Sequence, residues 1–278
     1  MKKIIKVAHS PDSDDAFMFY ALKHGKVASD RFDFDIVRED IEALNHEAQV
    51  ETYDITALSI HAYAHLADKY VLTASGASMA EEDYGPMVVA KKNIDVNDLK
   101  DYKVAIPGEW TTAFLVLKIF EPQIQHVVMP FEKIMDAVLN DEVDAGLIIH
   151  EGQLQYKNLG LRKILSLIDV WKVFAGDLPL PLGGSAIKKS LGKETIQELS
   201  ALQRKSIEYS MVSPDEARDY AHQFKRDMSP VELTQYLSWY ANKRTLDIGD
   251  EGREAIQLLF DLAIEKGLLE KAVNVEII

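Results

Sequence analysis

The sequence has no cysteine at any of its 278 positions. Disulfide bonds, thiolate nucleophiles, zinc ribbons and iron–sulfur clusters all need this residue, so each of them is excluded. Three glycine-rich motifs are also missing: G-x-G-x-x-G for dinucleotides, G-x-x-x-x-G-K-[ST] for nucleotide phosphates, and G-x-S-x-G for a nucleophilic serine. These absences argue against the commonest sites of redox, phosphoryl-transfer and serine-hydrolase chemistry.

Long apolar runs and positive charge are also scarce. No stretch approaches the roughly 20 apolar residues of a membrane-spanning helix, and the opening MKKIIKVAHS has no apolar signal-peptide core. The 31 Lys and Arg residues are outnumbered by 45 Asp and Glu residues, which gives a net charge of −14. Such an acidic chain repels the phosphates of nucleic acids and of anionic membranes. We therefore expect a cytoplasmic protein that binds neither nucleic acid nor membrane.

The composition itself is that of a folded globular protein. Hydrophobic residues make up 47% and charged residues 27%, which is enough apolar material for a sizeable core. A length of 278 residues suits one large α/β unit or two lobes of ordinary size.

Short apolar runs alternate with amphipathic runs through the first two-thirds of the chain. Strands that alternate with helices in this way predict parallel βαβ units. The expected strands cover residues 4–10, 32–40, 54–60, 86–92, 103–107, 126–130 and 144–151. The expected helices cover residues 12–25, 39–49, 61–70, 111–120 and 131–142.

One βαβ pattern occurs twice. Asp54 and Asp144 each follow a helix and a short polar turn, and each precedes a buried strand. This favours one architectural unit used in two lobes, although any two βαβ units share some of these features.

The chain changes character after LPLPLGGSAIKK, residues 178–189, because the remainder is almost entirely helical. Ser213 and Ser229 each precede a proline and are expected to cap helices, and Asp250 is expected to head the last one. An early βαβ lobe, a second βαβ lobe and a helical tail predict a two-lobed α/β fold with a ligand cleft between the lobes. The first lobe is expected to comprise residues 1–85 and 186–278, the second residues 86–185, with crossings near 85–92 and 178–188.

Ligands of open parallel sheets bind beyond the carboxyl ends of the strands, where helices begin. The first such loop, residues 10–15, contains Ser13, Asp14 and Asp15. In one interpretation Ser13 caps the following helix and the two acids complement its dipole. In the other, the carboxylates accept hydrogen bonds from a hydroxylated ligand.

Further candidates stand at corresponding places along the chain. Thr111 and Thr112 either cap a helix or hold a carboxylate or phosphate with their hydroxyls and the free N–H groups of that helix start. Ser59 precedes the next helix and is a cap or a contact. Gly183 and Gly184 form a tight turn in the expected hinge, or bring backbone N–H groups close to a ligand.

His150 is the most informative single residue. It follows the apolar run of residues 146–149, so we expect it at a strand end that faces the cleft. With an ordinary pKa near 6.5 it is a candidate base at neutral pH, and the alternative is a hydrogen-bonded structural histidine. Glu151 is a possible partner, but adjacent strand residues point to opposite faces. His61 and His65 have a spacing compatible with metal binding but lack the rest of the motif, so no metal site is expected.

Four segments together, in order and spacing, resemble the 1,4-dihydroxy-6-naphthoate synthases of the futalosine route to menaquinone. They are SPDSDDAFMFYALKHGKV, WTTAF, GLIIHEGQLQY and LPLPLGG, and the helical tail with NKRTLDIGDEG continues the likeness. The resemblance implies a type II periplasmic-binding-protein-like fold without a signal peptide. It also implies cleavage of a small anionic substrate, cyclic dehypoxanthine futalosine, into 1,4-dihydroxy-6-naphthoate and dihydroxyacetone, with no cofactor and no metal.

The resemblance also implies roles for particular residues. The family's catalytic histidine falls on His150, and its polar cleft residues fall on Asp14, Ser59, Thr111 and Thr112. The family often has Asn before the Asp of the first loop, whereas here both positions, Asp14 and Asp15, are acids. An extra carboxylate beside an anionic substrate is unfavourable unless it is capped or turned away.

Two alternatives stay open at this point. One is chorismate dehydratase of the same pathway, against which the GLIIHE segment argues. The other is a non-enzymatic protein that binds a small carboxylate, against which the missing export signal argues. The sequence gives no indication of an oligomeric state.

Overall fold

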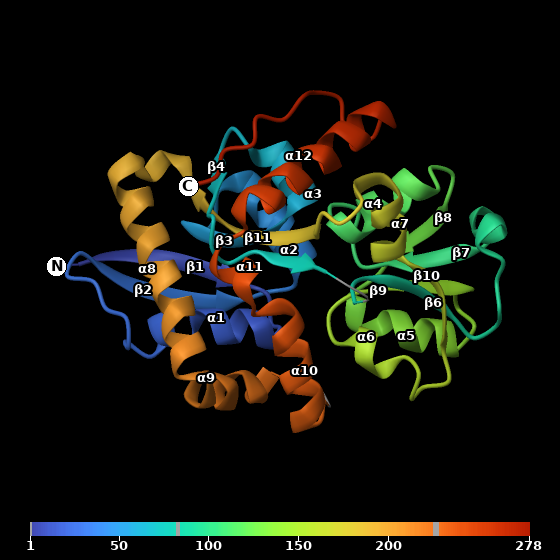
Figure 1. The fold of residues 1–278 in the computed structure, drawn as a ribbon, viewed down its shortest axis with the longest axis horizontal. Coiled ribbons are helices and arrows are strands. Elements are labelled where there is room, and N and C mark those ends of the chain that lie inside the picture. Colours follow the sequence, from blue (N-terminus) through green and yellow to red (C-terminus); the bar gives the residue numbers. More distant parts are fainter. Residues whose placement is uncertain (1, 82–83, 225–227) are drawn as a thin grey trace.

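Two β-sheets divide the molecule into two α/β lobes that lie side by side (Figure 1). The computed structural model describes residues 2–81, 84–224 and 228–278. The first sheet has the order β2-β1-β3-β11-β4, and β5 also pairs with β11. Its strands are β1 (Lys3–His9), β2 (Phe32–Arg38), β3 (Ile55–Ser59), β4 (Tyr70–Leu72), β5 (Ser78–Ala80) and β11 (Leu180–Lys188).

The second sheet has the order β10-β6-β9-β7-β8. Its strands are β6 (Met87–Ala90), β7 (Lys103–Ile106), β8 (Gln125–Val128), β9 (Ala145–Ile148) and β10 (Arg162–Ser166). In both lobes the predicted βαβ strands are parallel, but β6 and β11 are antiparallel to their neighbours. These two strands enter their sheets directly from the other lobe, so no helical crossover sets their direction.

Helices cover both sheets, and the C-terminal helices belong to the first lobe. The helices of the first lobe are α1 (Ser13–Lys23), α2 (Ile41–Glu47), α3 (Ile60–Leu66), α8 (Lys193–Val212), α9 (Pro214–Ala221), α10 (Pro230–Tyr240), α11 (Lys243–Leu246) and α12 (Gly249–Glu265). Those of the second lobe are α4 (Thr112–Phe120), α5 (Phe131–Leu139), α6 (Gly152–Gln155) and α7 (Leu167–Ala175). Short 3₁₀ turns occupy Ala48–Val50, Val96–Asp101, Lys189–Leu191 and His222–Phe224.

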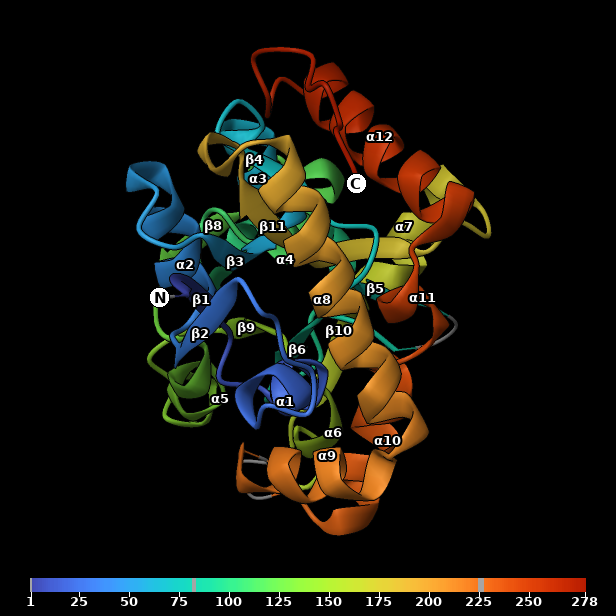
Figure 2. The same ribbon diagram turned by 90° about the vertical axis from the view of Figure 1, so that its left-hand side faces the viewer.

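The long helix α8 crosses the first lobe and packs on α1 (Figure 2). Ser206 of α8 donates a hydrogen bond to the Met18 carbonyl (2.8 Å) and accepts one from the Leu22 N–H (3.2 Å). The buried Ser206 hydroxyl thus ties the helical tail to the first helix of the chain.

The repeated Asp is used identically in the two lobes. A carboxylate oxygen of Asp54 accepts the Lys6 N–H (3.0 Å), and one of Asp144 accepts the Lys103 N–H (2.8 Å). The backbone N–H of each Asp also bonds the carbonyl of the same lysine. In each lobe the Asp therefore fixes the start of the strand that follows it against its parallel neighbour.

Helix starts agree only in part with the sequence-based expectation. Ser229 caps α10 and forms a reciprocal capping box with Glu232. Ser213 makes no side-chain cap bond, and Asp12 rather than Ser13 precedes α1. The last helix begins at Gly249, one residue before the predicted Asp250.

The largest apolar cluster is continuous across the lobes. It joins Leu58 and Tyr63 of the first lobe to Leu115 and Trp171 of the second, and Phe260 of α12 packs into it. The lobes are therefore held together by this shared apolar packing, in addition to the two segments of chain that cross between them.

The lobe boundaries expected at residues 85/86 and 185/186 stay a prediction. Sheet membership supports the first of them, because β5 and β6 lie in different sheets. The second falls inside β11, all of which pairs in the first sheet. We therefore propose to move it to residues 176–179, between α7 and β11.

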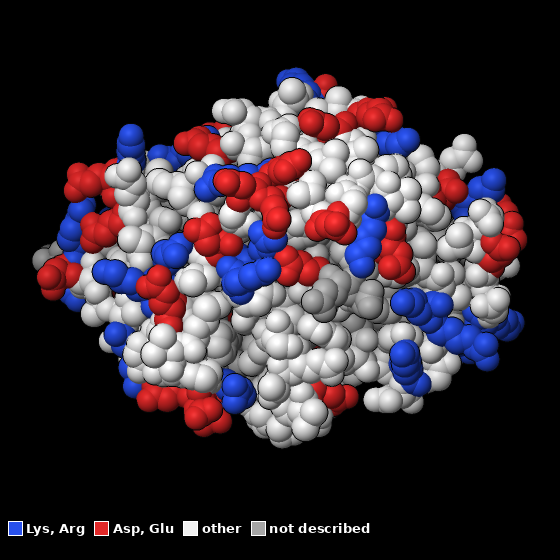
Figure 3. Space-filling model, viewed as in Figure 1, with Lys and Arg blue, Asp and Glu red and all other residues white. Residues whose placement is uncertain are grey.

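The exposed surface mixes charges of both signs. Figure 3 shows acidic and basic side chains interspersed over most of one face, with a group of basic side chains at its lower right. None of the helices in the described residues combines the length and apolar character that a membrane crossing requires.

Candidate functional site

A cavity that is partly open to solvent is lined by residues from both lobes. The seven site residues predicted from the sequence all line it: Asp14, Ser59, Thr111, Thr112, His150, Gly183 and Gly184. Polar residues that the prediction missed also line it: Ser10, Asp12, Ser78, Gln153, Tyr236 and Tyr240.

His150 lies in a turn rather than at a strand end. Strand β9 stops at Ile148, and His150 has a left-handed backbone conformation with φ 53°. Its Nδ1 lies 2.5 Å from Oδ2 of Asp12, whose side chain is only 1% exposed. The ring of Phe131 stands edge-on to the imidazole, with 4.8 Å between centroids. The buried Nε2 has no hydrogen-bond partner among the described residues.

The electrostatic surroundings of His150 favour its protonated form. Burial lowers the pKa of His150, but the charge and hydrogen bond of Asp12, with the charges of Glu151 and Asp14, outweigh it and raise the pKa to about 9. The imidazole is therefore mostly protonated at pH 7, unlike one with the ordinary pKa. Strand β9 ends before Glu151, so the alternation of strand side chains does not apply to it, and the direction of its side chain stays a prediction.

Asp14 and Asp15 are buried at the start of α1. Asp14 accepts hydrogen bonds from the hydroxyls of Tyr236 and Ser78, both at 3.2 Å. Burial, with the charges of Asp15 and Asp12, raises the pKa of Asp14 to about 8, so this carboxyl is largely neutral at pH 7. Asp15 accepts the Ser10 N–H (2.7 Å), and burial with the Asp12 charge raises its pKa to about 6. The cavity is therefore less negative than three ionised carboxylates would make it.

Thr111 and Thr112 lie at the start of α4, as predicted, and their hydroxyls already have partners. Thr111 Oγ1 accepts the Phe114 N–H (3.3 Å) and donates to the Gly108 carbonyl (2.8 Å), so it caps the helix. Thr112 Oγ1 accepts the His61 N–H (3.1 Å) and donates to the Leu182 carbonyl (2.5 Å). Both of those partners lie in the first lobe, so Thr112 bridges the lobes.

Ser59, Gly183 and Gly184 come from paired strands. Gly183 lies opposite Ser59 in the antiparallel pair of β11 and β3, and Gly184 lies opposite Leu58. The expected tight turn at the two glycines is therefore wrong, because pairing with β3 keeps them extended. Two hydrogen bonds join Ser59 to Asn45. The Ser59 hydroxyl accepts one from the Asn45 side-chain amide (3.1 Å), and the Ser59 backbone N–H donates the other to Asn45 Oδ1 (3.0 Å).

Helix α10 contributes two tyrosines that the sequence analysis did not single out. Tyr236 and Tyr240 are four residues apart and so share a helix face. The Tyr240 hydroxyl donates to Oε1 of Gln153 (2.9 Å), which also accepts the Gly85 N–H (2.9 Å). Gln153 thus links α6 of the second lobe, a lobe crossing and the helical tail.

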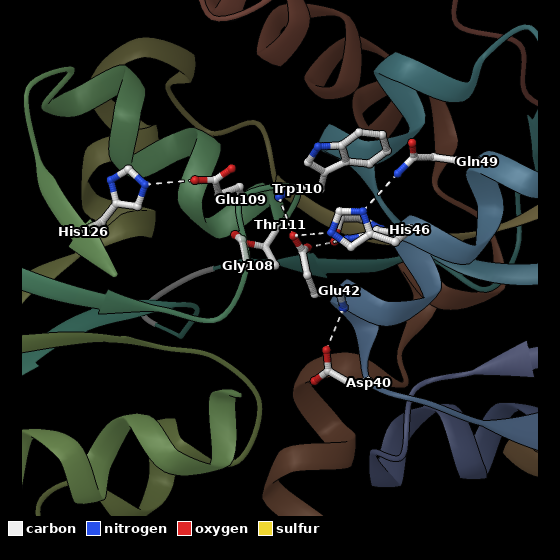
Figure 4. A network of polar contacts seen from close by, with 11 residues as sticks. Asp40, Glu42, His46, Gln49, Gly108, Glu109, Trp110, Thr111 and His126 are labelled. Atoms are coloured by element: carbon white, nitrogen blue, oxygen red, sulfur yellow. Dashed lines mark hydrogen bonds and ion pairs between the residues drawn. The ribbon is translucent and has the colours of Figure 1, made fainter. Parts of the chain in front are cut away.

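A second set of contacts joins the lobes beside the cavity (Figure 4). Glu42 of α2 accepts the Trp110 N–H (3.0 Å) from the loop before α4 and forms an ion pair with His46 (3.4 Å). The Trp110 ring lies against the rings of His46 (5.3 Å) and His65 (5.0 Å). These four residues are called the clasp below.

The spacing of His61 and His65 serves ring packing. Their ring centroids are 5.3 Å apart, and His65 continues the stack onto Trp110. Within the described parts of the chain, no group of three or more His, Asp or Glu residues has the geometry of a metal site.

Comparison with curated proteins finds relatives of almost equal length. The chain is 36% identical over 264 residues to a protein of Thermus thermophilus named 1,4-dihydroxy-6-naphtoate synthase. The matched residues make up 95% of this chain and 95% of the relative. It is 32% identical over 271 residues to a Streptomyces coelicolor protein of the same name, covering 95% of this chain and 94% of the relative.

Solved structures include one close relative and a wider group that shares the fold. A crystal structure from Archaeoglobus fulgidus has a TM-score of 0.91 and 43% identity, covering 96% of this chain and 98% of that one. A Candida albicans protein described as having the generic periplasmic binding protein fold has a TM-score of 0.68 at 17% identity, with 99% and 98% coverage. The fold predicted from the sequence is therefore confirmed.

The comparison with protein families agrees with these likenesses. A family model described as Menaquinone biosynthesis matches residues 5–265. That range contains every residue of the cavity described above. The chain therefore belongs to this menaquinone biosynthesis family of enzymes, built on the periplasmic-binding-protein-like fold.

Proposed function

We propose that the protein is a lyase that cleaves cyclic dehypoxanthine futalosine to 1,4-dihydroxy-6-naphthoate and dihydroxyacetone, with His150 as general base. The observation that carries this proposal is the placement of His150 in the interlobe cavity, with Nδ1 on Asp12 and Nε2 without a hydrogen-bond partner among the described residues. The names and full-length coverage of the two curated relatives support the choice of reaction.

The chemistry needs one base and a place for negative charge. A neutral imidazole removes a proton from the substrate, the carbon–carbon bond breaks to release dihydroxyacetone, and the remaining ring system becomes aromatic. General-base catalysis of this kind contributes about 10²–10⁴-fold. Hydrogen-bond donors stabilise the oxyanion that develops as the bond breaks.

The start of α4 is the proposed seat of the substrate carboxylate. The first turn of a helix has N–H groups without partners inside the helix, and its dipole favours an anion. Thr112 and Ala113 supply those groups at the cavity wall. Because the Thr111 hydroxyl caps the helix, we assign it the role of holding this loop in shape.

The proposal also requires that the acids of the cavity tolerate an anion. Near pH 7 a largely neutral Asp14 adds little charge, and the positive charge of His150 offsets one of the two negative charges of Asp12 and Asp15. This charge balance accounts for the extra acid of the first loop. Our proposal assigns no cofactor and no metal to the reaction.

Purified protein incubated with cyclic dehypoxanthine futalosine tests the proposal. We expect both products in equal amounts, measured by absorbance of the naphthoate and an enzymatic assay for dihydroxyacetone. Chorismate is the comparison substrate. Turnover of chorismate alone would make the protein a dehydratase, and tight binding without turnover of either compound would make it a binding protein.

A further inference from the structure

The contact between Asp12 and His150 joins segments that are far apart in the chain and lie in different lobes. Asp12 comes from the loop between β1 and α1, and His150 from the turn between β9 and α6. The distance from Nδ1 to Oδ2 is 2.5 Å, and both side chains are largely buried. A contact this short between a ring nitrogen and a carboxylate is a charge-assisted hydrogen bond.

Asp12 is itself held in place by its surroundings. The Ser10 hydroxyl donates to the same Oδ2 (2.8 Å), and the Asp12 N–H donates back to that hydroxyl (3.3 Å). The Asp12 carbonyl accepts the Ala16 N–H (3.0 Å) in the first turn of α1. The carboxylate is therefore fixed relative to the first lobe before it meets the ring.

We propose that Asp12 is a positioning residue that fixes the orientation and tautomer of His150, and that the pair forms only when the two lobes meet. This inference rests on the proposed function, in which His150 is the base. A carboxylate accepts hydrogen bonds and donates none, so Nδ1 must carry the proton. In the neutral ring the lone pair then belongs to Nε2, the nitrogen without a hydrogen-bond partner among the described residues.

Other acids around His150 act through their charge. Asp14 and Asp15 face it from α1, Asp40 from the start of α2, and Glu151 follows it in the turn. All of them favour the imidazolium form, and neutralising any of them makes the ring a weaker base. The choice of tautomer is assigned to Asp12, because its oxygen is at hydrogen-bond distance from Nδ1.

Asp12→Asn tests the proposal, because it removes the charge while keeping the size. The Asn amide donates to Nδ1 and pushes the ring proton to Nε2, which disables the base. We expect kcat to fall by about 10²–10⁴-fold with KM changed only a few-fold, as happens when an orienting aspartate is replaced in a catalytic triad.

Nuclear magnetic resonance of ¹⁵N-histidine-labelled protein gives a readout independent of turnover. His150→Gln identifies the His150 signals by difference. In the wild type above pH 10 we expect the tautomer with the proton on Nδ1, and in Asp12→Asn we expect the other tautomer and a lower midpoint of titration.

Asp40→Asn is the matched control. Asp40 also faces His150, and it caps α2 by accepting the Glu42 N–H (2.9 Å), a role that Asn fills equally well. It is expected to keep turnover within a few-fold of the wild type and to leave the tautomer unchanged.

The outcomes separate this inference from the function on which it rests. If the wild type releases no dihydroxyacetone, the proposed function fails, and the tautomer still decides the role of Asp12. If His150→Ala is inactive while Asp12→Asn retains wild-type turnover, the positioning role is overturned. A wild-type ring with its proton on Nε2 also overturns it, even if Asp12→Asn does not fold.

Discussion

The side chain of His150 is both the proposed general base and the ion-pair partner of the buried Asp12 carboxylate. Replacing it with Ala should lower turnover by about 10²–10⁴-fold, the usual contribution of a general base. It also removes the imidazole that lies 2.5 Å from the buried Asp12 carboxylate, so the melting temperature should fall as well. Single-turnover release of dihydroxyacetone measures the first effect, and circular dichroism confirms that the variant is folded. Near-normal turnover in a folded variant would remove His150 from the mechanism and leave Asp14 and Asp15 as the next candidates.

The raised pKa of His150 predicts the pH dependence of the reaction. Asp12 and its neighbours raise that pKa to about 9, and only the deprotonated ring is a base. The value of kcat/KM, which reports on the free enzyme, should therefore increase with pH and level off above about 9. A decrease over the same range would mean that the imidazolium is the reactive form.

Asp14 titrates in an overlapping range and needs a control. Its pKa is raised to about 8, so it gains charge as His150 loses its own. Asp14→Asn keeps the hydrogen-bond acceptor for Tyr236 and removes this titration. The rise in kcat/KM should persist in this variant if it comes from His150.

At the scale of the elements, the start of α4 is where substrate affinity should reside. Changing Thr111 and Thr112 together to Ala removes the helix cap and the bridge to Leu182. The two hydroxyls hold the loop that presents the N–H groups of the seat, so we expect KM to rise by about 10-fold, or about 1.4 kcal/mol of binding free energy, while kcat changes less. The double Ser variant keeps both hydroxyls and is the matched control. Unchanged affinity for the naphthoate product in the Ala variant would show that the two hydroxyls are not needed to hold the carboxylate seat.

Continuous apolar runs predicted strands such as β3, β6 and β9 because these strands are buried on both faces. The rule that ligands sit beyond strand ends placed the loops before α1, α3 and α4 at one cavity. Tyr236 and Tyr240 were missed because no motif marks their helix, and its packing on α1 and β5 brings α10 to the cavity. The pairing of Asp12 with His150 could not be predicted because it depends on how the lobes meet. The left-handed backbone conformation of His150 could not be predicted either, because an apolar pattern gives no information on the sign of φ.

For the whole molecule, the clasp contact between the lobes requires a residue without a side chain at position 108. A Cβ at Gly108 would overlap the carboxyl group of Glu42, which bonds the Trp110 N–H. Gly108→Ala should displace Glu42, weaken the contact between the lobes and shift the molecule toward a more open arrangement. Small-angle scattering should show a larger radius of gyration, and KM should rise.

Glu42→Gln is the companion variant. It keeps the acceptor for the Trp110 N–H, and it loses the ion pair with His46 and the acceptor for the Asn45 amide (3.2 Å). It should stay close to wild type in both measurements. An unchanged radius in Gly108→Ala would show that the shared apolar core, rather than the clasp, sets the arrangement of the lobes.

Because Trp110 lies at the contact between the lobes, its intrinsic fluorescence can report on their separation. The sequence has three tryptophans, of which Trp171 is buried in the core and Trp239 is stacked on Tyr84. Replacing these two by Phe leaves a single indole whose neighbours, His46 and His65, both lie across the lobe boundary. Its emission should change whenever the lobes separate. Stopped-flow fluorescence would then follow any lobe opening that is slow enough to limit turnover, without any attached dye.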